Sequence, residues 1–121
     1  TAMVTLVSFR NAWKGLRVVI SRERNARFHV LAAIVTLVAG VLMRISYPEM
    51  ALVLAMITLV FFAEVVNTAV ERTLDLIVTE NNQIVKLVKD MMAGAVLVAA
   101  VGAVFVGVCV FGPYIVRLFT R

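Results

Sequence analysis

Three long apolar stretches dominate this sequence, and they restrict the chain to folds that lie in a membrane. They cover residues 28–44, 50–72 and 90–112, and each is predicted to form a transmembrane helix. The hydrocarbon core of a bilayer, about 30 Å thick, is crossed by an apolar helix of about 20 residues. Because 63% of the 121 residues are hydrophobic, a small soluble domain could not cover them. We therefore expect an all-α membrane protein with a single domain over residues 1–121.

The N-terminal segment is predicted to form an amphipathic helix over residues 3–24 that lies in the membrane interface. Its apolar residues recur every three or four positions, whereas basic residues occupy another face. The apolar positions are Leu6, Phe9, Trp13, Leu16 and Ile20. Because basic residues next to apolar spans attract anionic headgroups, we expect membrane lipids as their partner and no nucleic acid.

The second and third stretches are predicted to form longer helices with distinct features. The second continues as one helix from about residue 50 to 78, and its last half carries polar groups. The third stretch is rich in small residues such as Gly94 and Ala95, which allow membrane helices to approach closely. A bulky residue at either position is predicted to disrupt helix packing. Pro113 follows the stretch and is predicted to end the helix.

The distribution of lysine and arginine predicts how the chain crosses the membrane. If the N-terminus is cytoplasmic, nine of the 12 basic residues lie on that side. Six of them precede the first span, and the others are Arg72, Lys86 and Lys89. The opposite side has Arg44, Arg117 and Arg121. Because cytoplasmic loops carry the excess of basic residues, this orientation is favoured.

Polar residues of the second helix form a candidate functional site. The residues are Glu64, Asn67, Glu71 and Asp75. On a helix with 100° per residue, the last three lie at roughly −60°, −20° and +20° from the first, and all four share one narrow stripe. Ionisable groups in a membrane helix are costly and usually face a protein interior or a cavity. The stripe is therefore expected to have a function or a polar partner.

The residue types in this region suit chemistry on phosphate groups. Glu23, Lys89 and Asp90 are expected at the same cytoplasmic level as the stripe. Carboxylates without a cysteine cluster suit a hard cation such as Mg²⁺, which normally accompanies substrate phosphates. Phosphoryl transfer needs positioned charge and a base. Glu64, the deepest carboxylate, suits a general base for a hydroxyl, and Glu71, nearer the surface, suits the metal.

The residues by themselves leave three interpretations of the stripe open. It could belong to a catalytic site, carry ions or protons through a bundle, or form a hydrogen-bonded seam between helices. Neither G-x-x-x-x-G-K-[ST] nor G-x-G-x-x-G occurs, which excludes the common phosphate-binding loops. A non-enzymatic or ion-handling small membrane bundle is the alternative to an enzyme.

Two motifs resemble the prokaryotic diacylglycerol kinase and undecaprenol kinase family. They are E-x-x-N-[ST]-A-x-E at residues 64–71 and K-D-x-x-[AS]-[AG]-A-V at residues 89–96. Residues 8–16 also resemble the amphipathic helix of this family, and the likeness is collinear over almost the whole chain. The resemblance implies a homotrimeric lipid kinase with three spans per subunit in the bacterial inner membrane. Such an enzyme would use ATP and Mg²⁺ to phosphorylate a lipid alcohol at the cytoplasmic face.

The resemblance also implies roles for individual residues. Glu64 would be the catalytic base, with Asn67 and Ala93 beside it at the lipid substrate. Glu23 and Glu71 would hold the metal on the ATP phosphates. The nucleotide-binding residues would be Asn11, Glu23, Glu71, Glu80, Asn82, Lys89 and Asp90. One departure is in the polar loop, where the family usually has a histidine and this chain has asparagine.

The acceptor lipid is predicted from residues 23–29. Glu23-Arg24-Asn25 and the following Arg27-Phe28-His29 resemble undecaprenol kinases more than diacylglycerol kinases. Undecaprenol is therefore favoured, with undecaprenyl phosphate as product, over diacylglycerol, which would give phosphatidic acid. His29 is assigned no role, because a lone histidine at the entrance of a span is more often a headgroup or structural contact.

Overall fold

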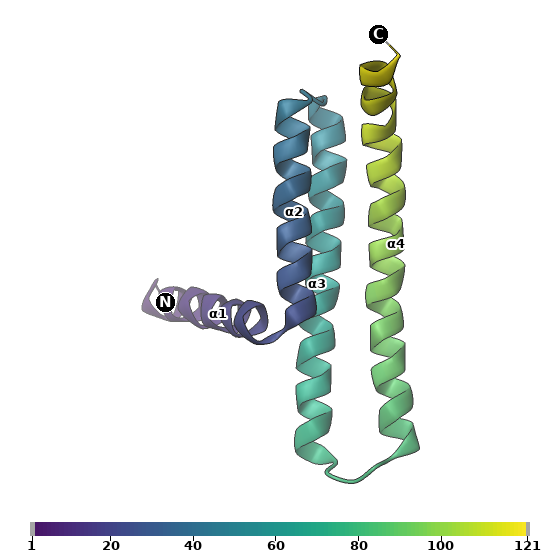
Figure 1. Ribbon diagram of the computed structural model, residues 1–121. Helices are drawn as coiled ribbons and strands as arrows, with labels where there is room; N and C mark the ends of the chain where they lie inside the picture. Colours follow the sequence, from purple (N-terminus) through teal and green to yellow (C-terminus); the bar gives the residue numbers. More distant parts are fainter. Residues whose placement is uncertain (1, 121) are drawn as a thin grey trace.

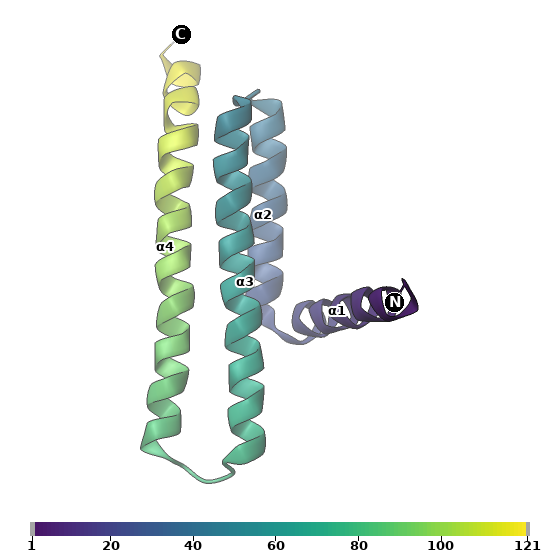
Figure 2. The ribbon, with the colours of Figure 1, turned by 180° about the vertical axis from the view of Figure 1, so that it is seen from behind.

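The computed structural model describes residues 2–120, which form four α-helices (Figure 1). The helices are α1 (Ala2–Arg22), α2 (Arg24–Leu42), α3 (Tyr47–Ile77) and α4 (Gln83–Phe119). In both views α2, α3 and α4 run side by side, whereas α1 projects sideways from one side of the bundle (Figures 1 and 2). Helix α3 is central, because it packs against each of the other three.

Helices α2, α3 and α4 are each long and apolar enough to cross a membrane, with mean hydropathies of 1.7, 2.2 and 2.6 over their most apolar windows. Most of their large apolar side chains are exposed, as expected for helices that are covered by lipid or by other subunits. The prediction of an all-α membrane protein is confirmed. Arg121, which was included in the predicted orientation, and the first residue of the predicted domain lie outside the described residues.

Helix α3 begins at Tyr47, before the predicted start at residue 50, because a capping box precedes it. The backbone N–H of Glu49 donates to the Ser46 hydroxyl at 3.3 Å, and the backbone N–H of Ser46 donates to the Glu49 carboxylate at 3.0 Å. The same carboxylate accepts a hydrogen bond from the Tyr114 hydroxyl at 2.6 Å. This contact joins α3 to α4 at the end of the bundle far from the α3–α4 loop.

The prediction that Pro113 ends the third helix is wrong, because α4 continues through it to Phe119. Proline lacks the N–H that would donate to the preceding turn, but membrane helices tolerate this loss through local adjustments. Helix α4 also begins well before the predicted span. The side-chain oxygen of Asn82 caps it by accepting hydrogen bonds from the backbone N–H groups of Ile84 at 2.8 Å and Val85 at 3.3 Å.

A corner between α1 and α2 holds Glu23 over α3. Helix α1 ends immediately before this residue, and α2 begins immediately after it. The Arg27 guanidinium donates to the carbonyl oxygens of Ser21 at 2.7 Å and Ile20 at 3.3 Å, so it satisfies acceptors at the end of α1. Ala26 is 0% exposed. The corner is therefore anchored by backbone contacts and by packing.

The closest contact of a glycine in α4 with another helix is at Gly102. A Cβ atom there would lie 3.3 Å from Met56 Cε of α3, whereas a Cβ at Gly94 would meet nothing within 4 Å. Ala95 is exposed. The expectation that Gly94 and Ala95 mark close helix packing is thus not met within one chain.

We expect Gly102→Leu to lower the free energy of unfolding by about 1–3 kcal/mol, because a branched side chain would force Met56 and α3 to move. Thermal unfolding in mild detergent would measure the change. Gly94→Leu is the matched control, because it adds the same side chain to the same helix where this chain leaves open space. Equal melting temperatures for the two variants would contradict the prediction.

Candidate active site

Glu64 is the centre of the candidate site, and it lies on α3 opposite the start of α2. The residue is only 3% exposed. Within residues 2–120, its Oε1 atom has no hydrogen-bond partner. The Nε2 atom of His29 on α2 lies 3.7 Å from this oxygen. One turn further along α3, the Thr68 hydroxyl is also buried and donates to the backbone carbonyl of Glu64 at 3.0 Å. A buried carboxylate with an unpaired oxygen can accept a proton from a substrate.

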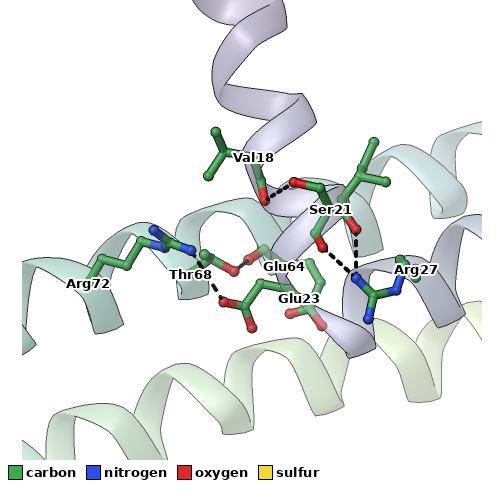
Figure 3. A network of polar contacts seen from close by, with 8 residues as sticks. Val18, Ser21, Glu23, Arg27, Glu64, Thr68 and Arg72 are labelled. Carbon is green, nitrogen blue, oxygen red and sulfur yellow. Dashed lines mark hydrogen bonds and ion pairs between the residues drawn. The ribbon is translucent and has the colours of Figure 1, made fainter.

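Glu23 brings a second carboxylate to this region from the corner between α1 and α2 (Figure 3). Its Oε1 lies 3.9 Å from Nη2 of Arg72, which belongs to α3. Carboxylates from two parts of the chain thus lie in one region, and carboxylate oxygens are ligands that Mg²⁺ prefers.

Helix α4 contributes a cation to the site. The Lys89 ammonium donates to Oδ1 of Asp75 on α3 at 2.6 Å. Asp75 is the residue of the predicted stripe nearest the α3–α4 loop. A partly exposed ammonium beside carboxylates can pair with phosphate oxygens, which form strong charge-assisted hydrogen bonds.

The polar stripe of α3 contains one further unpaired group. The side-chain oxygen of Asn67 is buried and has no hydrogen-bond partner within the described part of the chain. Buried polar groups are usually hydrogen-bonded, and those that are not often serve a function. Asn67 and Glu64 therefore both have an oxygen that a ligand could satisfy.

The other predicted site residues are exposed, and within residues 2–120 no hydrogen bond or ion pair joins them to this cluster. They are Asn11, Glu80, Asn82, Asp90 and Ala93. Asp90 pairs instead with Lys86 on its own helix, at 3.1 Å. The side-chain oxygen of Asn82 is engaged in capping α4, so its amide nitrogen is the group that remains for a nucleotide.

The structure brings two further side chains to the site, His29 and Arg72, for which the sequence predicted no role there. For Arg72 a signal was present, because it directly follows Glu71 of the polar stripe. For His29 the local sequence contains no comparable signal. Its proximity to Glu64 depends on the alignment of α2 against α3, which periodicity does not predict.

The carboxylates fit a metal that arrives with a nucleotide. Among the described residues, no group of three or more His, Cys, Asp or Glu side chains could hold a metal ion by itself. Mg²⁺ is commonly bound by one or two carboxylates together with substrate phosphates and water. Glu71, which is half-buried on α3, and Glu23, at the corner before α2, each have carboxylate oxygens of the kind that such a site requires.

Comparisons with known proteins agree on one family. The family model described as prokaryotic diacylglycerol kinase matches residues 10–111. A diacylglycerol kinase of Synechocystis sp. is 37% identical over 93% of this chain and 65% of its own length, so that relative is considerably longer. An undecaprenol kinase of Bacillus subtilis is 38% identical over 88% of this chain and 86% of its own length. A diacylglycerol kinase of Escherichia coli is 30% identical over 77% of this chain and 76% of its own length.

Proposed function

The chain belongs to the prokaryotic diacylglycerol kinase family and is a lipid kinase, and we propose that it transfers the γ-phosphate of ATP to the hydroxyl of a membrane lipid alcohol. Undecaprenol is the favoured acceptor and diacylglycerol the alternative. This preference is supported by the resemblance of residues 23–29 to undecaprenol kinases. The observation that carries the catalytic assignment is the buried Glu64, whose Oε1 lacks a hydrogen-bond partner within residues 2–120.

Glu64 is proposed as the general base. As the lipid oxygen attacks the γ-phosphorus, the hydroxyl proton moves to the Glu64 carboxylate, and the bond from the γ-phosphorus to the bridging oxygen breaks to release ADP. Asn67 and Ala93 are proposed to contact the lipid beside this group. The unpaired side-chain oxygen of Asn67 supports its part in substrate binding.

Glu23 and Glu71 are proposed to hold Mg²⁺ with the ATP phosphates. The ion, when bound, neutralises charge on the phosphoryl group. Lys89 is proposed to pair with phosphate oxygens in the same region. Further nucleotide contacts are proposed for exposed residues that water-borne ATP can reach, namely Asn11, Glu80, Asn82 and Asp90.

We expect Glu71→Gln to raise the Mg²⁺ concentration needed for half-maximal activity by about tenfold, because the ion would lose a carboxylate ligand. Removal of even a residue that supports a metal ligand typically lowers metal affinity by about 10- to 100-fold. The KM for lipid should change little, because Glu71 is assigned to the nucleotide. Steady-state rates over a Mg²⁺ titration, at fixed ATP and lipid, would measure both quantities. An unchanged Mg²⁺ requirement would contradict the metal-binding role.

The active assembly is proposed to be a homotrimer in the bacterial inner membrane, with α1 in the cytoplasmic interface. The transverse position of α1 (Figure 1) and its exposed Phe9 and Trp13 support the interfacial location. Asn11 and Ala93 are exposed in the single chain, so a second copy could bring them to a site. Chemical cross-linking in mild detergent tests the assembly, and recovery of monomers alone would contradict it.

The activity is tested by transfer of labelled γ-phosphate from ATP to undecaprenol and to diacylglycerol in parallel, in mixed micelles with Mg²⁺. Faster transfer to undecaprenol would support the favoured acceptor, and faster transfer to diacylglycerol would replace it. Failure of the folded protein to label either lipid would contradict the proposed reaction.

A further inference from the structure

His29 has a polar nitrogen that faces the proposed base. The side chain projects from α2 and is 21% exposed, and its Nε2 lies 3.7 Å from Glu64 Oε1. This separation is too long for a direct hydrogen bond. The buried oxygen of Glu64 has no hydrogen-bond partner within the described residues, so no hydrogen bond already joins these two atoms.

An apolar groove ends at the same histidine. Its volume is about 910 Å³, and its walls come mainly from α2, α3 and α4. Of the described residues that line it, His29 alone has an ionisable side chain. The hydroxyl groups of Thr36 and Thr58, which also line the groove, donate to carbonyl oxygens of their own helices at 2.7 and 2.8 Å. The groove is thus apolar along its length and polar where it reaches the site.

We propose that His29 is a substrate-binding residue whose Nε2–H donates a hydrogen bond to the hydroxyl oxygen of the lipid alcohol, while Glu64 Oε1 accepts the proton of that hydroxyl. The apolar chain of the same lipid occupies the groove. This inference rests on the proposed function. It assigns a role to His29, which has none in the sequence motifs or among the residue roles that the family resemblance implies.

The distances suit a hydroxyl group between the two side chains. An oxygen hydrogen-bonded to both atoms at about 2.8 Å would hold them about 4–4.5 Å apart. The observed 3.7 Å is slightly shorter, so a small side-chain rotation admits the hydroxyl. A hydroxyl has one proton and two lone pairs. Its proton goes to Glu64, one lone pair accepts from His29, and the other attacks the γ-phosphorus as the bond to ADP breaks.

The groove makes a lipid chain the fitting occupant. It is lined at one end by His29, which lies 3.7 Å from the proposed base, and its walls offer apolar side chains and small residues such as Ala100 and Ala103. A long-chain alcohol matches this arrangement, because its hydroxyl group is at one end of an apolar chain. An occupant without a terminal hydroxyl would leave the unpaired oxygen of Glu64 unsatisfied, which costs free energy in an apolar environment.

The test compares His29→Leu, which removes the donor, with His29→Gln, which can present an amide N–H at a similar reach. His29→Leu is expected to lower kcat with the preferred lipid by about tenfold or more, because it leaves a hydrogen bond of the transition state unmade. The KM for ATP should change by less than about twofold, because the nucleotide is bound elsewhere. His29→Gln should restore most of the lost kcat.

Tyr114→Phe is the matched control, because it removes another polar contact between helices, at the far end of the bundle. Its kcat should equal that of the wild type. His29→Phe, which keeps an aromatic ring without a donor, repeats the test if the leucine variant unfolds. A wild-type kcat in the folded donor-free variant, or equal loss in His29→Gln, would overturn the inference. Absence of transfer by the wild type would overturn the proposed function, and this inference with it.

Discussion

Replacing Glu64 by glutamine is expected to lower kcat for lipid phosphorylation by about 100- to 10,000-fold, the usual contribution of a positioned general base. Glutamine has nearly the same shape but cannot accept the hydroxyl proton as a carboxylate does. Because Glu64 is 3% exposed, water cannot readily take over that role. The measurement is initial-rate transfer of labelled phosphate from ATP to undecaprenol and to diacylglycerol, over a range of lipid concentrations.

Glu49→Gln is the matched control for this variant. Glu49 lies on the same helix but at its other end, where it caps α3 and accepts from Tyr114. The same chemical change there should leave kcat within about twofold of the wild type, because the residue is remote from the reaction. If Glu64→Gln remains folded and as active as this control, Glu64 is not the base. If it instead loses its native assembly, the polar stripe is a structural seam.

Replacing Lys89 by methionine is expected to lower kcat/KM for ATP by about 100-fold, which is typical when one charged donor to a transferring phosphoryl group is removed. The ammonium of Lys89 lies 2.6 Å from the Asp75 carboxylate on α3. Without this ammonium, the carboxylates of α3 would repel the phosphates. Kinetics with ATP as the varied substrate, together with direct binding of a fluorescent ATP analogue, would measure the loss.

Lys86→Met is the matched control for Lys89→Met. Lys86 lies on the same helix and carries the same charge, but its side chain is 78% exposed and its partner is Asp90 on its own helix. Such exposed pairs have little energetic effect. We therefore expect near wild-type kinetics from Lys86→Met. Comparable losses in the two variants would show that net charge, rather than the position of Lys89, governs nucleotide affinity.

Local sequence patterns predict the polar stripe of the site, but they do not predict where helix α4 ends or how it packs. The face that Glu64, Asn67 and Glu71 share follows from helical periodicity alone. Pro113 shows the limit of local rules, since α4 continues through a residue that usually ends helices. Gly94 shows the same limit, because its small size indicates close packing, yet within residues 2–120 no other helix lies within 4 Å of a Cβ built there.

The sequence by itself determined that three helices are long and apolar enough to cross a membrane and that one of them carries acidic groups. Both follow from composition and period, because burying an apolar helix in lipid does not depend on its neighbours. Only the tertiary structure decided that His29 faces Glu64 and that Glu23 pairs with Arg72. These contacts depend on the corner between α1 and α2 and on the alignment of α2 against α3. The packing of helices against one another determines this corner and this alignment. It brings together residues that are far apart in the chain.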